Sequence, residues 1–168
     1  MELQEAKEKF IQAWGTFGSQ WGINRTMTQI HALLLVSAAP LSADDIMEQL
    51  QISRGNVNMN VRDLMDWGLV HKVLKPGERR EFFSAEKDIW KVFRQVVKER
   101  RKRELEPVFG ILEEVLKVQG DPKDPDYKAF VEPVRDIQKI ATRADSTLET
   151  LTKADENWFF TMLVKLLK

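Results

Sequence analysis

Residues 53–66 read SRGNVNMNVRDLMD, a segment with the features of a capped amphipathic helix. Ser53 is a favourable residue for capping the start of a helix, and Gly68 suits the left-handed conformation that commonly follows the end of one. The apolar residues between them recur at helical spacing, at Val57, Val61 and Leu64. The pattern predicts a helix from Arg54 to Asp66 with one buried face.

The opposite face of this helix carries polar side chains around Gly55 and Met59. Its first turns hold Arg54, Asn56, Asn58 and Arg62. Arginine and asparagine make paired hydrogen bonds with the edges of guanine and adenine in the major groove of DNA. Asparagine is also a poor residue for a helix interior, so contacts with bases or phosphates would explain Asn56, Asn58 and Asn60. An ordinary solvated helix explains this segment, taken alone, equally well.

Two helices are expected before this one. Thr26 or Thr28 can cap a helix that runs to Val36 and ends before Pro40. Ser42 can cap a short second helix with acidic residues in its first turn. This second helix and the polar helix after it, joined by a tight turn, predict a helix-turn-helix.

A β-hairpin is expected directly after the helix-turn-helix. Residues 69–74 alternate as a strand, residues 75–78 contain the turn dipeptide Pro-Gly, and residues 79–83 return as a second strand. A helix-turn-helix followed by a hairpin is a winged helix. The hairpin carries basic side chains around its tip, at Lys72, Lys75, Arg79 and Arg80. Arginine on such a wing suits the narrow, negative minor groove beside the major-groove helix.

The charge of the chain is balanced in total but uneven along it. The 168 residues include 26 Lys and Arg and 26 Asp and Glu. Residues 51–103 hold 14 basic and 7 acidic side chains, net +7, whereas residues 1–50 are at net −3 and residues 104–168 at net −4. A basic middle segment between acidic flanks is a weak indication of a polyanionic partner.

The composition excludes several kinds of site. The chain has no cysteine, which rules out disulfides, zinc ribbons, iron–sulfur clusters and a thiol nucleophile. Its two histidines lack metal-ligand spacing; His31 is expected in the core and His71 on the surface of the hairpin. No phosphate-binding glycine loop, catalytic triad or convincing carboxylate pair is present, so we expect no catalytic residue, metal or cofactor, and no enzyme. The longest apolar run is too short to span a bilayer, and the N-terminus is not a signal peptide.

Five short segments carry a family resemblance, namely Gly22-Ile23-Asn24-Arg25, Ser53-Arg54-Gly55-Asn56-Val57, Asn60-Val61-Arg62, Trp67-Gly68-Leu69-Val70 and Pro76-Gly77-Glu78-Arg79-Arg80. They resemble the GbsR-like branch of the MarR-type transcriptional regulators, strongly from about Trp14 to Glu106. The resemblance implies a dimeric winged-helix DNA-binding protein of the bacterial cytoplasm, usually a repressor. It also implies that residues 53–66 are the recognition helix. Glu78 stands where MarR-type wings more usually carry aspartate.

Ten residues are expected to contact double-stranded DNA, namely Ser42, Ser53, Arg54, Asn56, Asn58, Arg62, Lys72, Lys75, Arg79 and Arg80. A two-fold homodimer would bind a palindromic operator whose half-sites lie about one turn of DNA apart. The alternative is a winged helix that binds another protein without specific contact to DNA. The Arg and Asn face of the expected recognition helix disfavours that alternative.

The flanking segments read as long helices, over residues 2–21, 88–103, 108–118, 127–152 and 154–168. They offer more apolar surface than a small winged helix can cover, which favours dimerisation. We expect an N-terminal dimerisation helix at 1–22, a winged helix-turn-helix domain at 23–87 and a helical dimerisation or effector region at 88–168. The fold class is mainly α with a two-stranded β wing. The basic run 98–103 is interpreted as a solvated face in preference to a phosphate contact.

Aromatic residues recur along the first helix at Phe10, Trp14, Phe17 and Trp21. Core or dimer packing is the favoured interpretation of this stripe. The alternative is an effector pocket with Trp14, Phe17, Trp21 and Trp158 as its walls, because aromatic ring faces attract a quaternary ammonium ion. Some GbsR-like regulators resemble choline sensors, so the resemblance makes a choline-like osmolyte the candidate effector.

Overall fold

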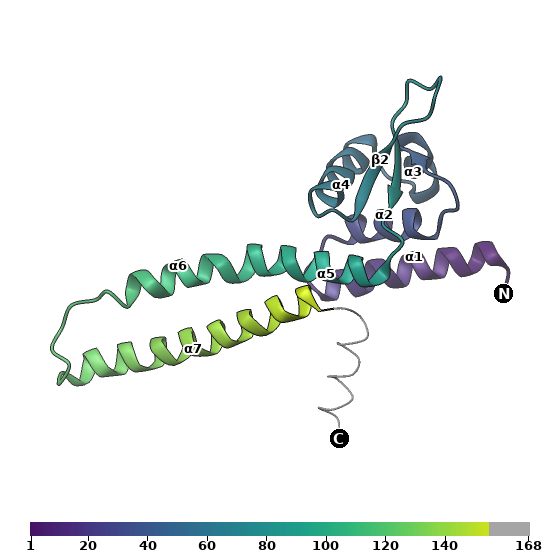
Figure 1. The fold of residues 1–168 in the computed structure, drawn as a ribbon. Coiled ribbons are helices and arrows are strands. Elements are labelled where there is room, and N and C mark those ends of the chain that lie inside the picture. The colour runs from purple at the N-terminus through teal and green to yellow at the C-terminus, as the bar shows by residue number, and fades with distance from the viewer. Residues whose placement is uncertain (155–168) are drawn as a thin grey trace. The chain divides into compact units, whose positions relative to one another are not determined.

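The structure is a computed structural model that describes residues 1–154 of the chain. Its internal contacts divide the chain into two compact units, Met1–Val92 and Phe93–Lys168. Helices dominate the described residues, and one small antiparallel sheet lies in the first unit (Figure 1). None of the described helices is both long and apolar enough to cross a membrane. Trp158, on the last expected helix, lies outside the described residues.

The first unit is a mainly helical winged-helix fold. Its elements are α1 (Leu3–Gln20), α2 (Arg25–Val36), β1 (Leu41–Ser42), α3 (Ala43–Leu50), α4 (Arg54–Asp66), β2 (Val70–Val73), β3 (Phe82–Ala85) and the start of α5 (Ile89–Arg100). This order confirms the predicted helix-turn-helix followed by a hairpin. The largest fully buried side chains in its core are Ile30, Leu34, Ile46, Val57, Asn60 and Leu64.

Helix α4 has the bounds that the sequence predicts. Ser53 Oγ accepts a hydrogen bond from a backbone N–H of the first turn at 3.3 Å. Gly68 has a φ of 69°, and the N–H of Leu69 donates to the carbonyl of Leu64 at 2.9 Å. This arrangement is the Schellman pattern, in which a glycine in the left-handed region ends a helix.

The sheet has three strands, where the sequence analysis expected two. Its order is β1-β3-β2, and both pairings are antiparallel. The additional strand β1 immediately precedes α3, and its Leu41 lies opposite Phe83. A strand of two residues is too short to display alternating hydrophobicity, so the sequence pattern did not indicate it.

Helix α2 begins earlier than predicted. Its N-cap is Asn24 rather than Thr26 or Thr28, and Asn24 Oδ1 accepts a hydrogen bond from the N–H of Met27 at 3.1 Å. Thr28 is buried instead, and its hydroxyl donates to the carbonyl of Arg25 at 2.9 Å. Asparagine ranks above threonine as an N-cap, which accounts for the earlier start.

Two glycines allow α1 to pack closely on α2. Gly15 and Gly18 are both buried. A Cβ atom at Gly15 would lie 2.6 Å from Cγ of Gln29, and a Cβ atom at Gly18 would lie closer still to the side chain of Thr28. Because real Cβ atoms do not approach neighbours at such distances, these glycines set the separation of the two helices.

The second unit is a helical hairpin. The end of α5 continues into one turn of π-helix, η1 (Arg101–Leu105), and then into α6 (Glu106–Val115). Helix α7 (Pro125–Lys153) runs back alongside α6 (Figure 1). Pro107 lies in the first turn of α6, directly after the π-helical turn, at a position where a missing N–H is tolerated.

The buried histidine His31 makes the stability of the first unit depend on pH. It is buried in α2, and desolvation, followed by the charge of Lys87, lowers the pKa of His31 to about 4. The unfolded chain, with a histidine pKa near 6.5, therefore binds a proton between these two pH values when the folded chain does not. The stability that neutral His31 contributes is complete above this window and is lost as the pH falls through it.

We expect the free energy of unfolding to fall by about 2 kcal/mol between pH 7 and pH 5 because of this one group. Urea denaturation at the two pH values measures the change. The variant His31→Phe should lack this component, whereas His71→Gln, which alters an exposed histidine, should retain it. An identical pH dependence in wild type and His31→Phe would contradict the assignment.

Candidate nucleic-acid interface

Helix α4 presents a polar face to solvent. Its inner side carries Val57, Val61 and Leu64, which are at most 3% exposed, and the helix packs against α2 and α3. Because an α-helix has 3.6 residues per turn, fixing this inner side also fixes which residues point outward. The exposed residues from the start of α4 to Arg62 are Arg54, Gly55, Asn56, Asn58, Met59 and Arg62.

One asparagine of α4 has a structural role instead of facing solvent. Asn60 is 1% exposed, and its Nδ2 donates to the carbonyl oxygen of Asn56 at 2.8 Å. The sequence analysis grouped Asn60 with the asparagines whose helix cost suggested base contacts, and that grouping is wrong for Asn60. Asn56 and Asn58 are both exposed.

The two arginines of α4 differ in their partners. Arg54 forms an ion pair with Asp44 of α3. Arg62 is exposed and makes no hydrogen bond or ion pair with any residue of the described part of the chain. A guanidinium without a partner can bind a base edge or a phosphate without first breaking an ion pair, so Arg62 is the more available of the two.

The wing ends in a tight turn over residues 75–78. The N–H of Glu78 donates to the carbonyl of Lys75 at 3.2 Å, and Gly77 has a φ of 80°. Proline at the second position and glycine with positive φ at the third are typical of a type II turn. The turn predicted from Pro76 and Gly77 is confirmed.

Arg79 and Arg80 lie in the loop after this turn, not on the second strand as predicted, because strand pairing begins only at Phe82. Arg80 Nε lies 3.4 Å from Glu78 Oε2, so the glutamate that replaces the usual aspartate still pairs with a wing arginine. Arg79 is exposed and has no hydrogen bond or ion pair within residues 1–154. Lys72, on β2, is paired with Glu81 at 2.6 Å.

The side chain of Lys75 contacts other residues of the first unit. Its Nζ lies 3.7 Å from the centre of the Phe82 ring and donates to the carbonyl of Pro40 at 3.5 Å. The first contact is a cation–π interaction, and the second ties the wing turn to the segment before β1. The sequence analysis placed Lys75 among the DNA contacts, and these partners favour a role in holding the wing.

Ser42 caps α3. It is 2% exposed, its Oγ accepts a hydrogen bond from the N–H of Asp45 at 3.2 Å, and its own N–H donates to Asp45 Oδ2 at 2.8 Å. The backbone and side-chain hydrogen bonds from Ser42 lower the pKa of the Asp45 carboxyl. This capping box confirms the predicted start of α3. Because Ser42 is buried, its side chain is not on the surface that could contact DNA.

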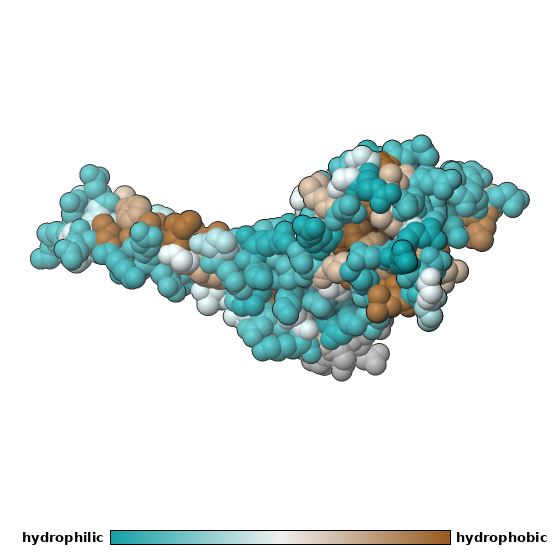
Figure 2. Space-filling model, turned by 90° about the horizontal axis from the view of Figure 1, so that it is seen from above, coloured by the Kyte–Doolittle hydropathy of each residue, from teal (hydrophilic) through white to brown (hydrophobic). Residues whose placement is uncertain are grey.

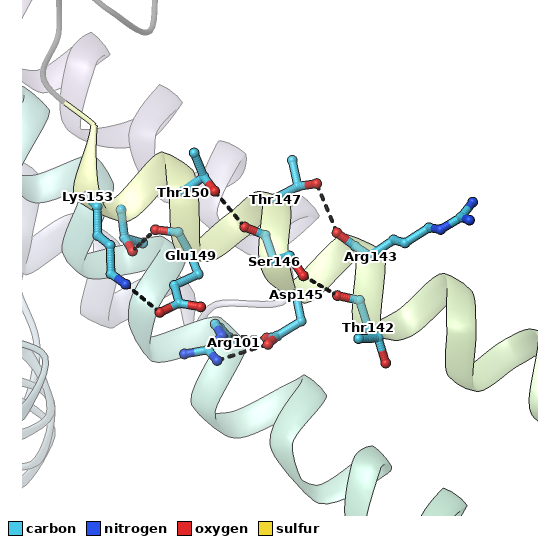
Figure 3. A network of polar contacts seen from close by, with 10 residues as sticks. Arg101, Thr142, Arg143, Asp145, Ser146, Thr147, Glu149, Thr150 and Lys153 are labelled. Carbon is cyan, nitrogen blue, oxygen red and sulfur yellow. Dashed lines mark hydrogen bonds and ion pairs between the residues drawn. The ribbon is translucent and has the colours of Figure 1, made fainter.

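The basic run 98–103 contains an ion pair that the sequence did not reveal. Arg101, in η1, donates through two guanidinium nitrogens to the carboxylate of Asp145 in α7, and both side chains are partly buried (Figure 3). These hydrogen bonds lower the pKa of Asp145. Within the same run, Arg100 pairs with Glu104 at 2.9 Å. Acidic partners inside the hairpin favour a structural role for these arginines.

The aromatic stripe on α1 forms a ladder of rings. Successive ring centres are 5.6, 5.7 and 5.2 Å apart from Phe10 through Trp14 and Phe17 to Trp21. Trp14 is half-buried, while Phe17 is 46% and Trp21 51% exposed. Three of the four expected pocket walls are therefore neighbours on one helix, and the fourth, Trp158, is outside the described residues.

Three comparisons with known proteins agree with this geometry. Residues 21–81 match the model of the MarR family. The chain is 25% identical over 156 residues to the HTH-type transcriptional repressor GbsR of Bacillus subtilis, covering 93% of this chain and 83% of GbsR. It is 20% identical over 91 residues to the repressor OpcR of the same organism, covering 54% and 49% of the two chains. A crystal structure of a transcriptional regulator matches with a TM-score of 0.65 and 16% identity, covering 88% of this chain and 96% of that one.

The fold and the exposed face of α4 define a winged helix-turn-helix protein that binds DNA. Within that class, residues 21–81 match the MarR family, and the chain is similar to the GbsR-like branch of transcriptional regulators, which are not enzymes.

The two wing arginines make a testable pair. Each phosphate contact by a cation contributes about 0.9 to the slope of log affinity against log salt concentration. We expect Arg79→Ala to lower this slope by about that amount. Arg80→Ala should lower it less, because Arg80 is already paired with Glu78.

Fluorescence anisotropy with a DNA duplex at several salt concentrations measures both slopes. Arg135→Ala, at an exposed arginine of α7, serves as the control for removing a surface charge. Equal slopes for wild type and Arg79→Ala would place Arg79 outside the interface.

Proposed function

We propose that the chain is a homodimeric repressor that binds a palindromic operator through α4 and the wing. The observation that carries this proposal is the exposed Arg and Asn face of α4, on a helix whose other side is fixed in the core. In each half-site, α4 enters the major groove and the wing reaches the adjacent minor groove. Bound dimers block access to the promoter.

The residues differ in the roles we assign to them. Base contacts are assigned to Asn56, Asn58 and Arg62, which are exposed on one side of α4. Phosphate or minor-groove contacts are assigned to Ser53, Arg54, Lys72, Arg79 and Arg80. Arg54, Lys72 and Arg80 would have to exchange a carboxylate partner for DNA, so we expect Arg62 and Arg79 to contribute most. We leave Ser42 and Lys75 out of this contact set.

The apolar surface of the hairpin supports dimerisation. Few large side chains of the described hairpin are buried, Leu112 and Val131 among them, while many apolar ones are exposed. The exposed set consists of Val108, Ile111, Val118, Phe130, Ile137 and Ile140. Figure 2 shows apolar side chains gathered along this hairpin. A second copy that covers them would remove this surface from water. We propose residues 1–22 and 88–168 as the dimerisation regions around a DNA-binding domain at 23–87.

Substitutions on the exposed apolar side of α7 test the proposed dimer. Ile137 and Ile140 are 52% and 68% exposed in the single chain, so changing them has little effect on the fold of the hairpin. We expect Ile137→Asn with Ile140→Asn to convert a dimer into monomers and to weaken binding to a full operator at least tenfold. The matched control Ile137→Leu with Ile140→Leu keeps the apolar surface and should remain dimeric.

Light scattering after size exclusion gives the mass, and selection of bound duplexes from a randomised library gives the operator. An inverted repeat bound by two chains is the expected result. A monomeric wild type, or a selection without an inverted repeat, would refute the dimer on a palindrome. Loss of all sequence preference would favour a protein-binding winged helix.

We further propose that the aromatic ladder of α1 binds a choline-like effector that releases the operator. Exposed rings at Phe17 and Trp21 offer π faces to a quaternary ammonium ion. Such a ligand relieves repression only if it binds the DNA-free conformation more tightly than the DNA-bound one.

Calorimetry with choline and with its neutral isostere 3,3-dimethylbutan-1-ol tests the cation–π contribution. We expect choline to bind at least tenfold more tightly than the neutral alcohol, and Trp21→Leu to abolish that preference. Equal affinity for the two compounds, or binding of neither, would contradict a cation site on this ladder.

A further inference from the structure

Nothing within residues 1–154 requires glycine at position 55. Gly55 lies in the first turn of α4, and a Cβ atom built there would meet only Ser53 Oγ, at 4.0 Å. Its φ is not positive, so its backbone does not require glycine either. Glycine within a helix is less stable than alanine by up to about 1 kcal/mol. Nothing in the described part of the protein offsets this cost at Gly55.

Met59 is one turn further along the same side of the helix. It is 53% exposed, the most exposed of the large apolar side chains on α4. Arg62 follows after three more residues, so Gly55, Met59 and Arg62 form one row at helical spacing, which we call the reading strip. The strip lies opposite the buried Val57 and is flanked by exposed Asn56 and Asn58.

We propose that Gly55 and Met59 read a thymine methyl group in each half-site of the operator. This inference rests on the proposed function, because it assumes that α4 enters the major groove. The C5-methyl of thymine is the only apolar group that a base pair presents there, and it is read by apolar side chains. The flexible thioether of methionine can adapt to a methyl surface.

Contact with DNA would then explain why position 55 is glycine. Without a Cβ atom, the first turn of α4 can lie closer to the edge of the base pairs than any other residue would allow. That approach brings Met59 into contact with the methyl group. The cost of glycine is thus explained by the DNA partner.

The reading strip also predicts how far apart the contacted bases lie. Met59 and Arg62 are separated by three residues, or about 4.5 Å along the helix axis. Successive bases on one strand are about 3.4 Å apart. The thymine that Met59 contacts and the guanine that Arg62 contacts should therefore lie within two base pairs of each other.

The test uses full-length protein and the duplex selected from a randomised library. Each thymine is replaced singly by deoxyuridine, which lacks only the 5-methyl group. For wild type, we expect one thymine in each half-site to lose about fourfold in affinity on replacement, the effect of exposing one buried methyl group. Met59→Ala should bind the unmodified duplex more weakly and should show no further loss on this replacement. Met65→Ala, at an exposed methionine off the strip, should respond like wild type.

A second variant tests Gly55. We expect Gly55→Ala to unfold at the same or a higher temperature than wild type and yet to bind the selected duplex at least tenfold more weakly, so misfolding cannot explain the loss. Gly110→Ala is the matched control, because a Cβ atom at Gly110 of α6 would also meet open space. It should leave the affinity for DNA unchanged.

The outcomes separate the two proposals. If wild type selects no sequence, the proposed function is overturned, and the reading strip with it. If wild type selects an operator but is indifferent to every thymine methyl, the assignment of Met59 is wrong while the proposed function stands. The same holds if Met59→Ala keeps the deoxyuridine effect. Full affinity in Gly55→Ala would overturn the role of Gly55.

Discussion

The packing of Val57, Val61 and Leu64 into the core of the first unit fixes the orientation of α4. These side chains lie on one side of the helix, and α4 contacts both α2 and α3. Rotation of α4 by one residue position would expose some of them and bury polar groups, at a cost of several kcal/mol. The residues offered to solvent are therefore set by the core, and Ser53 and Gly68 set the two ends of the helix.

Many basic side chains in the middle of the sequence are paired with carboxylates, which leaves few of them unpaired and ready to bind a phosphate. Arg54, Lys72 and Arg80 each lie beside a carboxylate in the first unit, and Arg101 is bound to Asp145 in the hairpin. Surface ion pairs contribute little to stability, so a phosphate can displace one at small cost. Their effect is to lower the positive potential that binds any DNA. Discrimination then depends more on groups that are already free to bind.

Periodicity and capping rules predicted the helix-turn-helix, the bounds of α4, the cap at Ser42 and the wing turn, because each of these depends on residues close in sequence. The features that the sequence did not predict depend instead on residues that are distant in sequence. β1 exists only through its pairing with β3, Asn60 is buried by tertiary packing, and the pairing of Arg101 with Asp145 joins residues 44 positions apart. The start of α2 was misplaced for a different reason, since Asn24 offered a stronger cap than either threonine considered.

The glycines of the chain illustrate how a structure distinguishes internal from external constraints. Gly15 and Gly18 are glycine because a side chain would collide with α2, and Gly77 because its φ is positive. Each of these requirements is met within the protein. At Gly55 the space is open and the backbone is unstrained, so the described part of the chain does not compensate the stability lost to glycine. The contact that we propose between the exposed side of α4 and DNA would supply the missing compensation from outside the chain.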